Sequence, residues 1–331
     1  MYTGLNSSML PISRLSIICF LLDGILILGA FAQSWEEVEA DQIRKLSQGA
    51  QSKRSLSVFP KDKTVIDMSV RELLHYYPSE LRRLEFSPSQ DELNGLLEKI
   101  GARLQSFLEN FSNTSSKEFV FLEKPGIRGA GISRSFNYMI LYRPNRAEAL
   151  LEEYRTDNEN RPVDQSAIRG FFVTSGYVGL SLNFHPEYQP ACQFRYLGRQ
   201  TSDPGAYLVA FAQRPETRNL QIQYTDAVTG KSTHVPVQGI AWVDPKTYQI
   251  LRLRINLLGS GNHSFMTEQS TDIKFGEVRF AETRKNLWLP HEVIVDTQIS
   301  GLVFRNQHRY AEYKLFNVQS DFKIENPKIH H

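Results

Sequence analysis

The longest helical pattern in the chain lies between residues 89 and 111. Ser89 and Glu92 have the spacing of a capping box, which marks the start of a helix. Apolar residues then recur at steps of three and four, which places them on one side of a helix: Leu93, Leu96, Leu97, Ile100, Leu104, Phe107, Leu108 and Phe111. Two further helices are predicted over Trp35–Gln48 and Val70–Leu84, and Pro78 interrupts the second because proline lacks an amide hydrogen.

From Glu118 onward, apolar residues recur at every second position, which is typical of β-strands. The alternation is clearest over Tyr248–Leu257. One face there is expected to carry Leu251, Leu253, Ile255 and Leu257, and the other Arg252, Arg254 and Asn256. Gly276 is expected to form a bulge that resets the register. The other predicted strands are Phe119–Glu123, Ser133–Tyr142, Gly170–Ser175, Tyr177–Phe184, Gln193–Arg199, Tyr207–Gln213, Leu220–Thr225, Gly239–Val243, Leu287–Gln298 and Leu302–Phe316.

The order of these elements predicts the fold class. Leu287–Gln298 and Leu302–Phe316 are joined tightly at Ser300-Gly301, so they must be antiparallel, because parallel neighbours need long crossovers. No helical segment recurs between the strands, which argues against a doubly wound fold. We therefore predict an α+β, mainly β protein with one large curved antiparallel sheet of sequential strands, forming an incomplete β-barrel. The N-terminal helices are expected to pack on or in its concave face.

The first 32 residues have the layout of a secretory signal peptide. Arg14 gives a positive start, Leu15–Leu28 is mostly apolar, and the small residues Ala30 and Ala32 precede Gln33. Asp23 interrupts the apolar run, so an uncleaved anchor stays open as an alternative, and Met9 is a second possible start. A lipoprotein signal is the weakest alternative, because no small residue stands just before Cys19. The chain is therefore expected to be exported, to the periplasm or beyond the cell, or to remain associated with the envelope.

The predicted organisation is a signal peptide over 1–32, a helical segment over 33–116, an antiparallel half-barrel over 117–325 and a tail over 326–331. A net charge of +2 over 331 residues does not favour nucleic acid as a partner. Only Cys192 of the two cysteines lies beyond the signal peptide, so an internal disulfide is excluded from the mature chain. We interpret Cys192 as a buried small hydrophobic residue rather than a reactive thiol.

No motif in the sequence carries a recognisable catalytic site. The glycines between residues 126 and 131 lack the order of a dinucleotide fingerprint and no predicted helix follows them, so we interpret them as a hairpin turn. His291 and Glu292 resemble half of a zinc-protease motif, but the second histidine is replaced by Val295. We therefore expect a protein without enzymatic activity, cofactor or metal site.

The last long strand has one side that suits a ligand-lined wall, because it mixes aromatic and hydrogen-bonding groups. That side carries Phe304, Asn306, His308 and Tyr310. The alternative is ordinary cross-strand pairing with Val293 and Val295 in a filled core.

Aromatic residues near turns, Trp242, Tyr248 and Trp288, are interpreted as lid residues of an apolar cavity or as rim packing. Together with the amphipathic helix, these patterns give the candidate ligand-binding residues Leu104, Phe107, Trp242, Leu253, Phe304, His308 and Tyr310.

Ten blocks of the sequence resemble a family of exported acidobacterial proteins that has no assigned activity. They are Leu73-Leu74, Tyr77–Leu81, Phe111–Ser116, Glu153–Asp157, Phe194–Gln200, Val209–Gln213, Gln238–Asp244, Thr247–Ile250, Leu287–Pro290 and Asn306–Tyr310. More distantly, Gly239–Asp244 and Tyr248–Arg252 are similar to a strand pair of the periplasmic lipoprotein-carrier (LolA/LolB-like) fold. This second resemblance implies an incomplete antiparallel barrel with helices plugging an apolar concavity.

Two functions follow as hypotheses. The first is an exported protein that binds or carries a lipid, an acyl chain or another apolar ligand in the half-barrel. The second is a structural or sensory envelope protein with a filled core that interacts with another protein. An enzyme is the third and weakest, because acid–base pairs, nucleophile settings and metal spacings are missing from the sequence.

The signal-peptide pattern makes a first prediction. The exported chain should begin at Gln33, because Ala30 and Ala32 suit the small-residue requirement of the cleavage site. N-terminal sequencing of protein isolated from the cell envelope measures this directly. A chain that still begins at Met1 or Met9 there would contradict it.

Overall fold

The computed structural model describes residues 56, 59–60, 63–123, 130–143, 151–163, 176–201, 205–216, 222–225, 232–258, 266–280, 283–299 and 302–316. Several predictions fall outside these residues: the signal peptide with Ala32 and Gln33, the helix over Trp35–Gln48, the strand over Gly170–Ser175 and the C-terminal tail. None of the helices in the described part of the chain combines the length and hydropathy needed to cross a bilayer.

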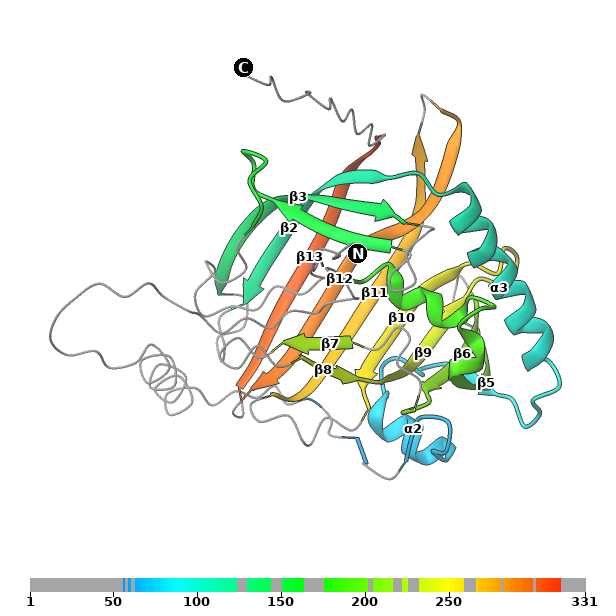
Figure 1. The fold of residues 1–331 in the computed structure, drawn as a ribbon. Helices are drawn as coiled ribbons and strands as arrows, with labels where there is room; N and C mark the ends of the chain where they lie inside the picture. The colour runs from blue at the N-terminus through cyan, green and yellow to red at the C-terminus, as the bar shows by residue number, and fades with distance from the viewer. Residues whose placement is uncertain are drawn as a thin grey trace, which may run out of the picture.

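An 11-stranded antiparallel sheet forms the body of the protein (Figure 1). Its strands are β1 (Leu84–Phe86), β2 (Thr114–Glu123), β3 (Gly131–Tyr142), β4 (Leu151–Thr156), β5 (Cys192–Gln200), β6 (Ala206–Gln213), β9 (Val237–Val243), β10 (Ile250–Leu257), β11 (Met266–Phe280), β12 (Lys285–Ile299) and β13 (Leu302–Leu315). β7 (Ile222–Thr225) and β8 (Ser232–Val235) pair separately. The predicted class, a mainly β protein with an open antiparallel sheet, is confirmed.

The spatial order of the strands differs from the sequential order that we predicted. The sheet runs β1-β5-β6-β9-β10-β11-β12-β13-β2-β3-β4. From β5 onward the strands neighbour one another nearly in chain order, but the three strands β2 to β4 join beyond β13. Pairing of β13 with β2 therefore places the last strand of the sheet beside the strand that follows α3, with Arg305 opposite Glu123 and Leu315 opposite Thr114.

Alternating side chains give the sheet an inner and an outer face. Leu253, Ile255 and Leu257 of β10 lie in the large core on the inner face, as predicted. Arg252 and Arg254 lie on the outer face, where both pair with Asp272 of β11.

The prediction was wrong for Leu251. A bulge between Ile250 and Arg252 shifts the register of β10 against β9. Ile250 joins the inner core in consequence, and Leu251 packs against the smaller cluster on the outer face. A bulge places an extra residue in one strand. The apolar pattern could not reveal it here, because Ile250 and Leu251 are both apolar and either one could face the inner core.

The main helix, α3 (Leu93–Asn110), covers part of the inner face. The side chains that it buries against the inner core are Leu96, Ile100, Leu104 and Leu108, while Leu93, Leu97 and Phe107 are partly buried there. The predicted capping box is wrong, because the helix starts after Glu92 and no side chain caps it. The hydroxyl of Ser89 instead accepts a hydrogen bond from the backbone amide of Asp91, at 3.0 Å.

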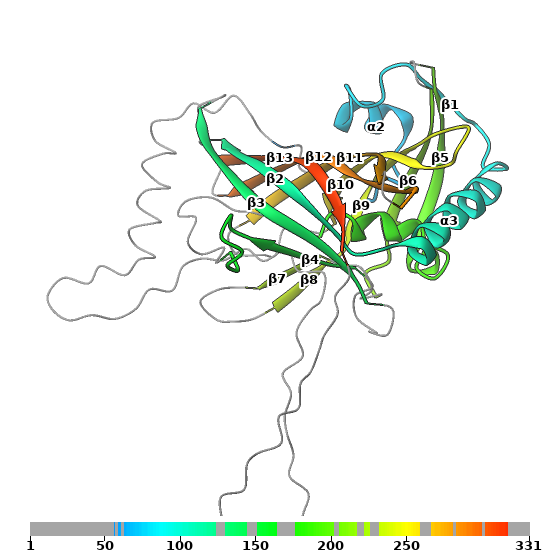
Figure 2. The ribbon, with the colours of Figure 1, turned by 90° about the horizontal axis from the view of Figure 1, so that it is seen from above.

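The shorter helix, α2 (Val70–Tyr76), packs on the opposite face of the sheet (Figure 2). Leu73 and Tyr77 belong to a core cluster with Leu208 and Ile240, whereas the neighbouring Val209 and Ala241 point into the inner core. The prediction that the N-terminal helices pack on the concave face therefore holds for α3 and is wrong for α2.

Residues 70–86 also differ from the predicted single interrupted helix. A capping box does exist here, between Ser69 and Glu72 at the start of α2. The helix ends at Tyr76, before Pro78, and the chain then forms β1, which pairs with β5. The predicted helical segment over 33–116 thus contains one strand of the sheet, and β2 begins at Thr114 rather than after residue 117.

Residues 176–191, called here the inner segment, lie under α3 against the inner face. The predicted strand Tyr177–Phe184 is wrong: η2 (Gly179–Phe184) is a 3₁₀ helix, and η3 (Gln189–Ala191) follows it. Every residue from Tyr177 to Phe184 is buried. Val178, Leu180, Leu182 and Phe184 alternate with Gly179, Ser181 and Asn183, which predicts a strand with one polar face. The polar positions are buried as well, so the alternation does not report a solvent-facing side.

The bulge that we predicted at Gly276 of β11 lies instead in the neighbouring strand, β12. The register of β11 against β12 shifts between Lys274 and Phe275, whose partners are Glu292 and Pro290. His291 is therefore the extra residue, and it belongs to β12. A Cβ atom at Gly276 would lie 3.3 Å from Nδ1 of His291, so the glycine makes room for the bulged side chain.

The packing of α3 makes a second prediction. Replacing Leu104 by alanine removes a buried side chain and should lower the free energy of unfolding by about 2–5 kcal/mol. Leu74→Ala on α2 is the matched control, because Leu74 is 42% exposed and its loss should cost less than about 0.5 kcal/mol. Urea denaturation of both variants measures the difference. Equal small losses would mean that α3 does not pack on the sheet in solution.

Candidate functional site

The structure brings six of the seven predicted site residues to the inner face. They are Leu104, Phe107, Leu253, Phe304, His308 and Tyr310. His308 is fully buried and lies opposite Val120 of β2 and Val293 of β12. The pairing with Val293 and Val295 that we predicted as the alternative is thus present as well.

Trp242 lies apart from the other six. Its side chain belongs to the outer cluster beside α2. Its indole Nε1 donates to Oε1 of Gln200 at 3.0 Å, and the guanidinium of Arg252 lies 4.5 Å from the ring centre. The other two aromatic residues near turns, Tyr248 and Trp288, pack partly buried against the inner core.

Strand β13 brings His308 and Tyr310 to a buried carboxylate that the sequence analysis did not single out. Glu118 of β2 is fully buried and accepts hydrogen bonds from Nδ1 of His308 at 2.8 Å and from the hydroxyl of Tyr310 at 3.0 Å. Arg155 of β4 donates to the same carboxylate through Nε and through Nη2, the latter at 2.7 Å. The Arg155 side chain is only 3% exposed.

The charges in this cluster follow from these contacts. Burial alone raises the pKa of Glu118, but the charge and hydrogen bonds of Arg155 and the hydrogen bond of His308 outweigh it and lower the pKa to about 2. Burial lowers the pKa of His308, so its ring stays neutral at physiological pH. Its proton must lie on Nδ1, which faces the carboxylate, and Nε2 can then accept from the hydroxyl of Tyr177 at 3.1 Å.

A second, half-buried carboxylate holds the start of the inner segment. Glu153 of β4 accepts hydrogen bonds from the backbone amides of Gly176, Tyr177 and Val178, at 2.6, 3.1 and 2.8 Å. It also accepts from the hydroxyl of Tyr138. Burial raises the pKa of Glu153. The two carboxylates therefore have different tasks: Glu118 balances Arg155, and Glu153 fixes the inner segment over the sheet.

We name the set Glu118, Tyr138, Glu153, Arg155, Tyr177, His308 and Tyr310 the inner polar cluster. Among the groups of this cluster, only Nη1 of Arg155 is buried and has no hydrogen-bond partner in the described part of the chain. A signal for Glu118 does exist in the sequence, since it shares a strand face with the apolar Val120 and Leu122. No local sequence pattern relates Glu118 to Arg155, because the two residues are 37 positions apart.

The other end of the inner face is apolar and lies under α3. Ile100, Leu104 and Phe107 of the helix, with Phe275 of β11 and Trp288 of β12, surround a residual space of about 10 Å³. That is roughly the room of one water molecule. The inner core continues from there without interruption to Tyr138 and Tyr310 of the inner polar cluster.

The ends of α3 are fixed to the sheet. Before the helix, Gln90 exchanges two hydrogen bonds with the backbone of Tyr196, at 2.9 and 2.7 Å. After it, Oδ1 of Asn113 accepts from the backbone amide of Tyr142 at 2.8 Å. Three hydrogen bonds hold the middle of the helix: Arg103 donates to the carbonyl of Thr247 at 2.8 Å, Lys99 to the hydroxyl of Tyr248 at 3.2 Å, and Gln189 of the inner segment to the carbonyl of Leu97 at 3.0 Å. Apolar packing of its buried stripe adds to them.

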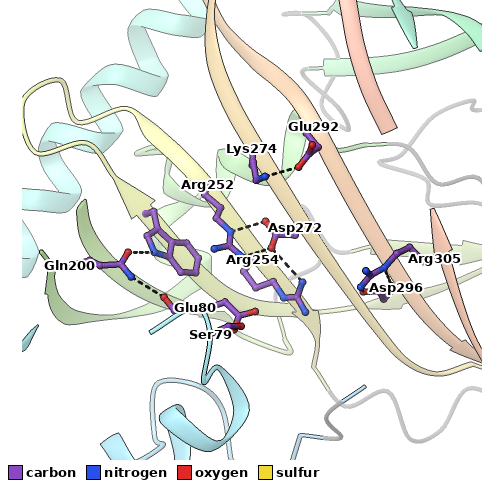
Figure 3. A network of polar contacts seen from close by, with 11 residues as sticks. Ser79, Glu80, Gln200, Arg252, Arg254, Asp272, Lys274, Glu292, Asp296 and Arg305 are labelled. Atoms are coloured by element: carbon purple, nitrogen blue, oxygen red, sulfur yellow. Dashed lines mark hydrogen bonds and ion pairs between the residues drawn. The ribbon is translucent and has the colours of Figure 1, made fainter. Parts of the chain in front are cut away.

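The outer face is a different environment, dominated by exposed or half-buried ion pairs (Figure 3). Arg252 and Arg254 meet Asp272, and Lys274 pairs with Glu292 at 2.6 Å. Arg305 donates to both oxygens of Asp296, at 2.6 and 2.5 Å. Since each charge here has a partner at the surface, this face presents a balanced polar surface.

A separate groove of about 520 Å³ lies on the outer face over β13, β2 and β3. Its lining is mixed, with Lys117, Asn137 and Lys314 beside Met139 and Phe316. It does not reach the inner polar cluster, whose residues are on the other side of the same strands.

The arrangement offers hydrogen bonding and apolar contact. Within the described residues, no three His, Cys, Asp or Glu side chains form a group suited to a metal ion. Cys192 is buried, and burial raises the pKa of its thiol to about 12, which fits its interpretation as a small hydrophobic residue.

The buried histidine makes a third prediction. Below pH 6.5 the unfolded chain binds a proton at this residue that the folded protein excludes, so stability falls with the pH. His308→Gln keeps a donor toward Glu118 but cannot titrate. Its loss of stability from pH 7.5 to 5.5 should be smaller than that of the wild type, by at most about 1.4 kcal/mol per pH unit.

Urea denaturation at three pH values measures these slopes. His75→Gln, which removes an exposed histidine of α2, is the control and should keep the wild-type slope. If His308→Gln also keeps it, the ring of His308 is accessible to protons in the folded state.

Comparison with known proteins places the fold among remote neighbours. No protein-family model matches the sequence, and no curated protein matches it either. An outer membrane lipoprotein-sorting protein domain from Vibrio parahaemolyticus is 8% identical with a TM-score of 0.37, covering 68% of this chain and 94% of that one. A DUF1329 family protein from Desulfovibrio piger is 11% identical with a TM-score of 0.39, covering 70% and 96%. Both likenesses are distant.

Proposed function

We propose that this protein is an exported binding protein without enzymatic activity, which holds an acyl chain or another apolar ligand between α3 and the inner face. The observation that carries the proposal is the way α3 lies on the sheet. Its apolar stripe covers a continuous apolar surface. Both flanks of the helix are fixed to strands, and its middle is held by apolar packing with three hydrogen bonds.

Such a helix is suited to act as a movable cover. The space beneath it is about 10 Å³, far below the roughly 300–1,000 Å³ of sites for small ligands, so a ligand must take the place of α3 side chains. An acyl chain offers the same kind of contact that Ile100, Leu104 and Phe107 make with the sheet. Exchange of one apolar contact for another costs little free energy, because both keep water away from the inner face.

The alternative is an envelope protein with a filled core whose surface binds another protein. The small space under α3 favours this reading, since a packed interior needs no ligand to be stable. The two proposals differ in one measurable property, namely whether the inner face accepts an apolar molecule when α3 is weakened.

Location in the periplasm or at the envelope is part of the proposal. It is supported by the signal-peptide pattern of residues 1–32. An apolar ligand of an exported protein must cross water between membranes or surfaces, and a covered inner face is a physical means of doing so.

A substitution in α3 tests the proposal and gives the fourth prediction. Leu104→Asp places a charge in the apolar contact and should detach the middle of the helix from the sheet. Binding of the apolar fluorophore diphenylhexatriene should then increase several-fold, while the far-UV circular dichroism of the sheet is retained. Ala102→Asp adds the same charge at an exposed position of α3 and should leave fluorophore binding unchanged. If Leu104→Asp folds and binds no more fluorophore than the wild type, the filled-core alternative is preferred.

A further inference from the structure

The inner polar cluster is costly where it stands, and the proposed function gives it no task. Taking an ion pair out of water costs several kcal/mol per ion, and apolar residues of similar volume often replace such a pair without loss of stability. Glu118 and Arg155 are nevertheless buried at one end of a mostly apolar inner face, which also buries the uncharged Thr114, Ser116 and Asn306. An apolar site with a few converging polar groups is typical of ligand recognition.

The hydrogen bonds of the cluster are complete except at one atom. The carboxylate of Glu118 accepts from Arg155, His308 and Tyr310. Nε2 of His308 is occupied by Tyr177, and the hydroxyl of Tyr138 by Glu153. Within the inner polar cluster, only Nη1 of Arg155 is buried and has no acceptor among the described residues. A buried donor on a charged group that lacks an acceptor is destabilising, so an acceptor oxygen brought by a ligand is favoured there.

The charge balance decides which oxygen suits this position. The charge of Arg155 is already neutralised by Glu118, with which it forms two hydrogen bonds. A carboxylate ligand would bring a further negative charge into a buried site that has no second cation among its described members, and Glu153 lies in the same cluster. An uncharged oxygen acceptor takes the free N–H groups without this penalty.

We propose that Nη1 of Arg155 binds the carbonyl oxygen of a neutral acyl group, an ester or an amide, and that the acyl chain runs from there along the inner face toward α3. This inference rests on the proposed function and adds the ligand class. The inner core joins Tyr138 and Tyr310 to Leu253 and Leu104 without a break, so the path of the chain is mostly apolar. Arg155 is the specificity-determining residue. The room for the ligand comes from movement of α3 and of the inner segment beyond Val178, the part that Glu153 does not hold.

Four fluorescent probes test this proposal at pH 7.5. Diphenylhexatriene has no hydrogen-bonding group, parinaric acid is a carboxylate, and its methyl ester and N-methylamide carry the same chain with a neutral carbonyl. The wild type should bind the ester and the amide about ten-fold more tightly than the acid, which corresponds to one hydrogen bond from a charged donor. A difference between ester and amide identifies which source of the carbonyl the site prefers.

Two variants and a control assign the preference to Arg155. Arg155→Lys keeps the charge opposite Glu118 but removes the second arm of the guanidinium. The double variant Arg155→Met with Glu118→Gln removes both charges and keeps an acceptor for Tyr310. Both should lose the preference for ester and amide while binding diphenylhexatriene as the wild type does. Arg305→Lys disturbs an equivalent two-bond pair with Asp296 on the outer face and should change nothing.

The outcomes separate this inference from the function on which it rests. Binding of diphenylhexatriene with equal affinities for acid and ester overturns the role of Arg155 and leaves the apolar site standing. Tighter binding of the acid overturns the neutral ligand class, as does a carbonyl preference that survives in both Arg155 variants. If the wild type and Leu104→Asp bind none of the four probes, the proposed function fails and the inference fails with it.

Discussion

Pairing of β13 with β2 is the interaction on which the rest of the structure depends. It is the only contact within the sheet between the strands from β5 to β13 and the three strands β2 to β4. Its register sets Tyr310 opposite Glu118 and His308 opposite Val120, and the next strands bring Tyr138 and Arg155 into line. A slip of one residue in this pairing would turn over the faces of β2 to β4 relative to β13, so Glu118 and Arg155 would lose His308 and Tyr310.

The two ends of the inner face are stabilised in different ways. Under α3, stability comes from apolar burial, which has no direction and tolerates exchange of one apolar group for another. Around Glu118 it comes from hydrogen bonds and charge, which require exact partners: removal of one member of a buried pair costs about 3–5 kcal/mol. The first region is therefore the more adaptable of the two, and the second is the more selective.

The open sheet also has to protect its edges. One edge is β1, a strand of three residues that is too short to extend the sheet by pairing with another chain. The other is β4, where Glu153 and Arg155 point inward into the inner polar cluster. Charged side chains that point inward at an edge strand disfavour the addition of further strands. Ion pairs such as that of Lys274 and Glu292 keep the outer face polar between the edges and α2.

The sequence by itself determined the mainly β class, the amphipathic character of α3 and the inward direction of Leu253, Phe304, His308 and Tyr310. Each depends on the local spacing of apolar residues, which the chain carries wherever it folds. It did not determine the register around Leu251, the 3₁₀ turn of η2, or the face on which α2 and Trp242 lie. Those depend on bulges and on which strands become neighbours. The pairing of Glu118 with Arg155 and His308 was likewise decided by the tertiary structure, because these residues meet only after β2, β4 and β13 assemble.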